Sequence, residues 1–212
     1  MKLRHLFEDP AGPKKLVVVY GGRFQPFHKG HYEAYKWLCK KFGESNVWIA
    51  TSNKTNFNPK NGDISPFNFK EKKEIMVSLY DIPQRRIIQC KNPAFSPVEV
   101  FELYKRFSIV YVNAVGKKDE SRYKEGDFFL PLPRPFELKN VEMLNSLDDK
   151  TGYYIDMPMQ TGEISGTLVR DTLMSAEGDE REDAFKKFFG KYDSVIDDLI
   201  RAKLKDIQGD DQ

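Results

Sequence analysis

The strongest constraint on the fold is a repeated alternation of short apolar runs with longer segments of helical periodicity. The first run, Leu16–Tyr20, is rich in β-branched residues, which is typical of a strand buried on both faces of a parallel sheet. Further strand-like runs occupy residues 47–51, 86–90, 109–115 and 153–157, and helical spacing occurs at 31–42, 69–80, 97–107 and from about 165 onward. The alternation predicts an α/β fold: a doubly wound, Rossmann-like parallel sheet with helices on both faces and a helical C-terminal tail.

Segments outside this alternation set the expected domain boundaries. Residues 1–15 are polar and contain two prolines, so we expect them to form an N-terminal arm. Residues 16–176 are expected to form one α/β domain. Residues 177–212 carry apolar residues at helical spacing and are expected to form a tail of two helices divided by Gly190. The tail is expected to pack over the sheet edge or against another copy of the chain, so a homo-oligomer and a monomer both stay open.

Composition excludes several classes of function. The net charge of +2, from 34 basic and 32 acidic residues, disfavours a nucleic-acid partner. No stretch approaches the roughly 20 apolar residues that a membrane helix requires. No export signal is visible either, so we expect a cytoplasmic protein without a membrane partner. Cys39 and Cys90 provide neither a disulfide framework nor a metal-ligand cluster, and both are expected to be buried free thiols.

The most informative segment is the loop between the first predicted strand and the first predicted helix, Gly21–His31. It contains two of the three histidines of the chain, His28 and His31, with Gly30 between them. Glycines let backbone N–H groups approach a ligand closely, and the N-terminus of the following helix favours a phosphate. The two imidazoles can donate hydrogen bonds to phosphate oxygens as negative charge develops in a transition state. The loop therefore predicts a site for phosphate chemistry.

The sequence of this loop, G-R-F-Q-P-F-H-K-G-H, resembles the HxGH signature of the nucleotidyltransferase superfamily, which is cytidylyltransferase-like. The loop sequence is most similar to that of nicotinamide-mononucleotide adenylyltransferases. The superfamily has a second signature, ISxTxxR, and Ile164–Arg170 matches it with Gly166 as the variable residue. Both motifs follow predicted strands and stand in the family order. The resemblance covers roughly residues 16–175.

This resemblance implies transfer of a nucleoside monophosphate, with AMP favoured, from a nucleoside triphosphate to a phosphate-bearing acceptor, with release of pyrophosphate. The implied catalytic residues are His28 and His31, on the α- and β-phosphates, and Arg170, on the β- and γ-phosphates. The implied nucleotide-binding residues are Gly22, Arg23, Phe24, Lys29, Gly30, Ser165 and Thr167. The charged turn after the strand at 109–115 either belongs to the same site or is solvated; its candidates are Lys117, Lys118, Asp119 and Arg122. Mg²⁺ is expected to be bound mainly through the triphosphate, so no protein ligand is assigned to it.

The acceptor is left open by the sequence. Nicotinamide mononucleotide is the leading acceptor, which would make the reaction NAD synthesis, but relatives use other phosphorylated acceptors, and the donor is either ATP or CTP. A nucleotide-binding module without turnover is the alternative from another class. Lys54 and loop aromatics can contact an acceptor, although local packing is the favoured interpretation; these aromatics are Phe57, Phe67, Phe128 and Phe129.

Overall fold

A computed structural model describes residues 14–58, 60, 63–95, 97–116, 129–136, 141–158 and 164–209. These residues fall into two compact units. The first unit contains the described residues up to Gly22, then Ala34–Ala50 and those from 90 to 158. The second unit contains Arg23–Glu33, Thr51–Gln89 and the described residues from 164 onward. The predicted division into arm, domain and tail stays a prediction.

The sheet has the order β3-β2-β1-β4-β6-β5. The strands are β1 (Lys15–Gly21), β2 (Val47–Thr51), β3 (Ile87–Gln89), β4 (Ile109–Val115), β5 (Phe129–Pro131) and β6 (Gly152–Asp156). In the first unit every pair of neighbouring strands is parallel, and β1 lies between β2 and β4, so that Val18 is opposite both Val47 and Val112. All seven residues of β4 and the five central residues of β1 are buried. The apolar runs therefore mark central strands of the core, as predicted.

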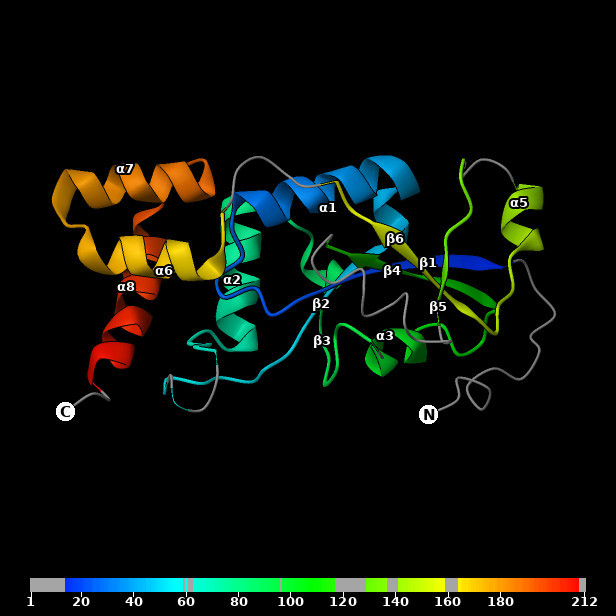
Figure 1. Ribbon diagram of the computed structural model, residues 1–212, viewed down its shortest axis with the longest axis horizontal. Helices are drawn as coiled ribbons and strands as arrows, with labels where there is room; N and C mark the ends of the chain where they lie inside the picture. The colour runs from blue at the N-terminus through cyan, green and yellow to red at the C-terminus, as the bar shows by residue number, and fades with distance from the viewer. Residues whose placement is uncertain are drawn as a thin grey trace. The chain divides into compact units, whose positions relative to one another are not determined.

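The strand order reverses beside β1, because the chain moves from β1 through β2 to β3 and then returns to β4 on the other side of β1. In the first unit, the part of α1 (Lys29–Phe42) from Ala34 onward and α3 (Val98–Glu102) lie on opposite sides of the strands (Figure 1). The predicted doubly wound α/β fold is confirmed. In such sheets ligands bind beyond the carboxyl ends of the strands, next to the point of reversal. The loop that starts at Gly22 leaves β1 at that end.

Helices dominate the second unit. They are α2 (Phe69–Tyr80), α6 (Gly166–Ser175), α7 (Gly178–Phe189) and α8 (Ser194–Gly209). α6 contacts both α7 and α8, and α8 also contacts α2 (Figure 1). Gly190 ends α7 with a positive φ of 88°, and its N–H donates to the Lys186 carbonyl, which confirms two helices divided at this glycine. Within this unit the tail helices pack on α6 and α2.

Several smaller elements depart from the sequence-based expectation. β5 was not predicted; it is three residues long, pairs only with β6 and is mostly exposed. The helix expected at 97–107 ends at Glu102, because the backbone continues in tight turns such as Tyr104 N–H to the Phe101 carbonyl. Neither Cys39 nor Cys90 forms a disulfide, but only Cys90 is buried, so the expectation that Cys39 is buried was wrong. The short helices are η2 (Glu44–Asn46), η4 (Gln84–Arg86) and α5 (Val141–Ser146).

Candidate functional site

The loop between β1 and α1 is held in place by close packing at both ends. A Cβ atom on Gly21 would lie 2.0 Å from the Pro93 carbonyl oxygen, so only glycine fits where the loop begins. Phe24 has a left-handed backbone, with φ of 48°, and its side chain is buried. Its ring packs edge-on against Phe27 and His31, with centroid distances of 5.2 and 5.0 Å. Side-chain packing thus maintains a backbone conformation that costs a non-glycine residue energy.

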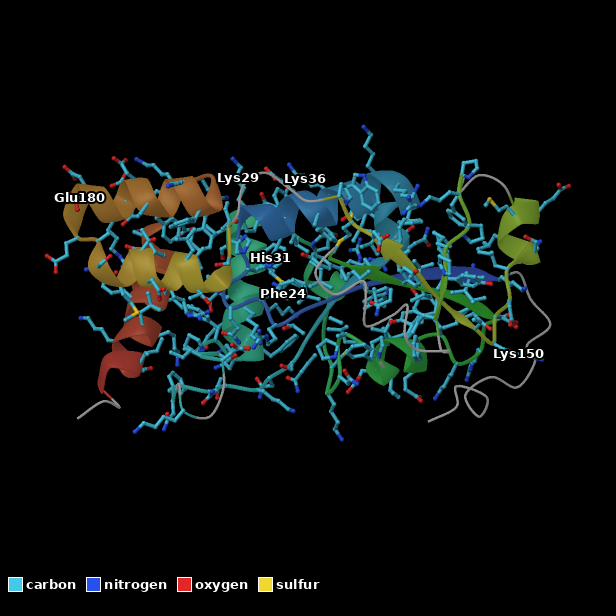
Figure 2. The ribbon with its side chains drawn as sticks, viewed as in Figure 1. Phe24, Lys29, His31, Lys36, Lys150 and Glu180 are labelled. Atoms are coloured by element: carbon cyan, nitrogen blue, oxygen red, sulfur yellow. The ribbon has the colours of Figure 1, made fainter. Side chains whose placement is uncertain are left out.

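His31 lies in the first turn of α1 (Figure 2), and His28 directly precedes this helix. Their rings stack with centroids 3.7 Å apart, and the His28 backbone N–H donates to His31 Nδ1 at 3.3 Å. A Cβ atom on Gly30 would lie 3.3 Å from two atoms of the His28 ring. Glycine at this position therefore leaves room for the His28 imidazole, which gives the HxGH spacing a direct steric reason.

Burial keeps both imidazoles neutral. It lowers the pKa of His28 to about 4, and burial together with the neighbouring His28 lowers the pKa of His31 well below its ordinary value. Because His31 Nδ1 accepts a hydrogen bond, the proton of its neutral ring lies on Nε2. The Nδ1 atom of His28 is buried without a hydrogen-bond partner among the described residues. The pair can thus offer ring donors to a ligand without carrying charge.

The second motif begins α6 and meets the first motif at one carbonyl oxygen. Ser165 caps the helix by accepting the Leu168 N–H at 3.1 Å. Arg170 is buried, and its Nη1 donates to the Gln25 carbonyl oxygen at 2.5 Å while Nη2 donates to Thr167 Oγ1 at 3.3 Å. A Cβ atom on Gly166 would lie 2.6 Å from the same Gln25 oxygen. The small residue of the motif lets α6 approach the HxGH loop.

Gln25 is a site residue that the sequence analysis missed. Its buried side-chain amide forms two hydrogen bonds with the backbone of Phe67: Nε2 donates to the carbonyl at 2.8 Å, and Oε1 accepts the N–H at 2.9 Å. Phe67 itself is fully buried and directly precedes Asn68, the N-cap of α2. Gln25 therefore ties the first motif to α2 with its side chain and to Arg170 with its carbonyl.

Lys72 is a second residue that was missed. It is fully buried on α2, and its Nζ donates to the Ser52 carbonyl at 2.7 Å and to Thr51 Oγ1 at 3.3 Å. The Thr51 hydroxyl donates in turn to the Arg23 carbonyl at 3.4 Å. Burial lowers the pKa of Lys72 to about 8. A sequence signal existed, because Lys72 shares a helical face with Ile75 and the other buried apolar residues of α2.

The other predicted site residues are more peripheral. Arg23 and Lys29 are exposed, and Arg23 forms an ion pair with the exposed Asp63. Thr167 is exposed apart from its bond with Arg170, and Gly22 is half-buried. The charged-turn candidates Lys117, Lys118, Asp119 and Arg122 lie outside the described residues, as does Phe128.

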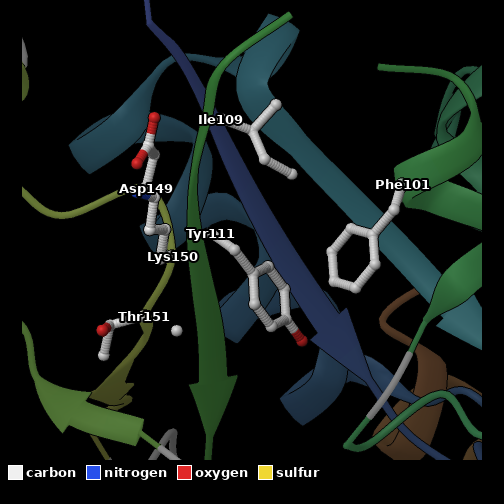
Figure 3. Close-up of a pocket in the computed structure, with 7 residues that line it drawn as sticks. Phe101, Ile109, Tyr111, Asp149, Lys150 and Thr151 are labelled. Atoms are coloured by element: carbon white, nitrogen blue, oxygen red, sulfur yellow. The ribbon is translucent and has the colours of Figure 1, made fainter. Parts of the chain in front are cut away.

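The first unit contains a small cleft whose lining residues lie outside both motifs in the sequence. It is lined by Phe101, Ile109, Tyr111, Asp149, Lys150, Thr151 and Gly152 (Figure 3). None of these residues belongs to either motif. Within the described part of the chain, no group of three or more acidic, histidine or cysteine side chains is placed to hold a metal ion. No described helix combines the length and the apolar character needed to cross a membrane.

Part of this chain is similar to a known protein family. Residues 19–91, which include the HxGH loop, match a family model described as cytidylyltransferase-like. A comparison with curated protein sequences found no match. The match to the family model and the fold confirm the predicted resemblance to cytidylyltransferase-like nucleotidyltransferases.

Two solved structures share the fold. The nicotinic acid mononucleotide adenylyltransferase of Plasmodium falciparum, solved with NaAD, is 16% identical with a TM-score of 0.52, over 91% of this chain and 98% of that one. The bifunctional NMN adenylyltransferase/ADP ribose pyrophosphatase of Francisella tularensis is 17% identical with a TM-score of 0.52, over 92% of this chain and 52% of that one. This chain thus spans about half the length of the bifunctional protein.

Proposed function

We propose that the protein is a nucleotidyltransferase that transfers AMP from ATP to a phosphate-bearing acceptor and releases pyrophosphate. The observation that carries this proposal is the meeting of the two motifs within the second unit. Arg170 and Gly166 of one motif both contact the Gln25 carbonyl of the other, close in sequence to the paired histidines. Two helix N-termini, those of α1 and α6, also belong to these motifs. Such termini favour bound phosphates.

The proposed reaction is an in-line attack of the acceptor phosphate on the α-phosphorus, with the bond to pyrophosphate breaking. The acceptor phosphate is already anionic, so the chain need not supply a general base, and catalysis rests on positioning and charge stabilisation. His28 and His31 donate ring hydrogen bonds to the α- and β-phosphates, with His31 using Nε2.

Arg170 and the start of α6 bind the β- and γ-phosphates in this proposal. A guanidinium has five N–H donors, and Gln25 and Thr167 occupy two of them, so donors remain for phosphate oxygens. Ser165 and Thr167 add hydroxyls to the same helix start. Mg²⁺ enters as part of the substrate, the magnesium complex of the triphosphate, held mainly by phosphate oxygens and water.

Nicotinamide mononucleotide is the acceptor that we propose first, which would make the reaction NAD synthesis. Support comes from the sequence of the HxGH loop, which is most similar to that of nicotinamide-mononucleotide adenylyltransferases. Cytidylyl transfer from CTP is the second candidate, favoured by the description of the family model. A homo-oligomeric, cytoplasmic enzyme is compatible with this proposal.

A substrate panel tests the choice of donor and acceptor. ATP and CTP are each combined with Mg²⁺ and with nicotinamide mononucleotide, nicotinic acid mononucleotide, phosphopantetheine, flavin mononucleotide, phosphocholine or glycerol phosphate, and pyrophosphate release is measured. We expect release with ATP and nicotinamide mononucleotide, together with formation of the dinucleotide. Release only with another pair would replace the substrate and keep the mechanism. Binding of ATP without release from any pair would favour a module without turnover.

A further inference from the structure

A buried ion pair joins the last two helices, outside the two motifs of the proposed site. Arg181 on α7 is 4% exposed and Asp197 on α8 is 2% exposed. The guanidinium meets the carboxylate at two points: Nε donates to Oδ2 at 3.1 Å, and Nη2 lies 2.7 Å from Oδ1. Burying such a pair is costly, and apolar residues of similar size are often as stable. The ion pair is therefore weak evidence of a stabilising role, and its contacts with other elements are more informative.

The third contact of Arg181 connects it to α6. Its Nη1 donates to the carbonyl oxygen of Leu173, in the last turn of α6. The last carbonyls of a helix have no partner within the helix, and a positive charge at that end is favourable. Leu173 lies three residues after Arg170, which is about one helical turn. Arg181 thus holds α6 from the end opposite to the Gln25 contact.

A second contact connects α8 to the other side of the site. Lys203 Nζ lies 3.0 Å from Glu71 Oε1 on α2. The carboxylate of Glu71 also accepts the Asn68 N–H and so completes the capping box of α2. The residue before this cap, Phe67, is the one whose backbone holds the Gln25 side chain. α8 therefore contacts α2, which follows Phe67, and also α6, which carries Arg170; both Phe67 and Arg170 form hydrogen bonds with Gln25.

We propose that Arg181 is a positioning residue of the nucleotidyltransferase site, which holds α6 so that Arg170 meets the Gln25 carbonyl and the phosphates. The inference rests on the proposed function for its catalytic consequence. Arg181 touches no substrate in this proposal and acts through the placement of Arg170. The C-terminal helices thereby belong to the catalytic scaffold.

The test separates positioning from stability with the double variant Arg181→Met/Asp197→Leu. Replacing both charges by apolar residues avoids leaving one buried charge unpaired, so we expect a folded protein. It lacks the hydrogen bond to the Leu173 carbonyl, and we expect kcat/KM for the triphosphate to fall about 10- to 100-fold. The matched control is Lys186→Met/Glu182→Leu, which removes an exposed ion pair of the same helix. We expect wild-type kcat/KM for this control.

A mutant cycle with Arg170→Ala tests whether Arg181 acts through Arg170. In the Arg170→Ala background we expect the double variant to cause little further loss. Wild-type turnover in the double variant, or a loss that adds in full to that of Arg170→Ala, would overturn the proposal.

Hydrogen exchange provides a readout that needs no turnover. We expect amides in the last turn of α6 to exchange about tenfold faster in the double variant than in the wild type. Should the double variant not fold, the same comparison is made with Arg181→Lys, which keeps the charge and loses the two-point geometry. Unchanged exchange in α6 overturns the positioning role. If α6 exchanges faster in the double variant but the wild type binds substrate without turnover, the proposed function is rejected and the structural link between Arg181 and α6 is kept.

Discussion

The chemistry of the site depends on which nitrogen of His31 carries its proton. The backbone N–H of His28 occupies Nδ1, and burial keeps the ring neutral, so Nε2 is the protonated atom. The hydrogen bond from a neutral donor becomes stronger as negative charge develops on a phosphate oxygen in the transition state. Because the donor has no net charge, it does not bind the substrate equally strongly in the ground state. At the residue scale, geometry and pKa therefore both support the proposed role of this imidazole as a neutral donor.

Replacing His31 by Ala and by Gln tests this role. Loss of the donor in His31→Ala should lower kcat by about 10²- to 10³-fold. His31→Gln places an amide N–H near the position of Nε2 and should retain more activity than His31→Ala. Steady-state kinetics with matched circular dichroism measures both. As a control, the exposed Lys40→Ala on the same helix should keep wild-type kcat. Equal activity of His31→Ala and wild type would remove His31 from the mechanism.

The buried ammonium of Lys72 predicts a specific dependence of stability on pH. Its pKa is about 8 in the folded protein against an ordinary 10.5, so the folded protein loses this proton before the unfolded chain does. The cost of burying the charge is present in full below pH 8 and is relieved as the pH rises to 10.5. The wild type should therefore gain stability relative to Lys72→Met across this window, by at most about 3 kcal/mol.

Urea unfolding of both proteins at several pH values measures this difference. The exposed Lys70→Met on the same helix serves as the control and should follow the wild-type profile. Parallel profiles for wild type and Lys72→Met would show that the lysine does not titrate differently in the folded state.

At the scale of elements, the approach of α6 to the HxGH loop depends on the lack of a side chain at Gly166. A methyl group there would lie 2.6 Å from the Gln25 carbonyl oxygen, which is backbone and cannot rotate away. Gly166→Ala should lower the free energy of unfolding by about 1–3 kcal/mol and also reduce turnover, because α6 carries Arg170. Gly116→Ala is the control for stability, since its Cβ would meet no described residue within 4 Å. Wild-type stability and turnover in Gly166→Ala would contradict this account of the packing.

The elements that the sequence predicted well have a clear apolar pattern. β2, α2 and β4 have the predicted bounds, because full burial produces continuous apolar runs and α2 has a clear helical period. β5 escaped prediction, since a three-residue edge strand with one partner needs no apolar pattern. The end of α3 was predicted too late, because helical spacing also fits the tight turns that follow Glu102.

In the candidate site, too, the sequence predicted only the residues that belong to a local pattern. The histidines and Arg170 could be predicted because each belongs to a short motif whose other residues are close in sequence. The roles of Gln25 and Arg181 arise from partners elsewhere in the chain, such as the contact of Gln25 with Arg170, 145 residues away. A glutamine within a known motif and an arginine in an amphipathic helix carry no local sign of such partners. Only the folded chain identifies them.

At the scale of the whole molecule, the central claim is that the two motifs form one site for nucleotidyl transfer. The family model covers only the first motif, and the fold likeness at 16–17% identity carries no information on substrate. The claim therefore rests on the contact of the motifs through the Gln25 carbonyl and on the neutral histidine pair.

The most direct measurement of this claim is pyrophosphate release by the wild type and by Arg170→Ala, with ATP, Mg²⁺ and nicotinamide mononucleotide. The account predicts release by the wild type in equal amount with a dinucleotide product. It also predicts a fall in kcat/KM of at least about 100-fold in Arg170→Ala, with the fold retained by circular dichroism. Equal release by wild type and Arg170→Ala would contradict the claim that the two motifs act as one site.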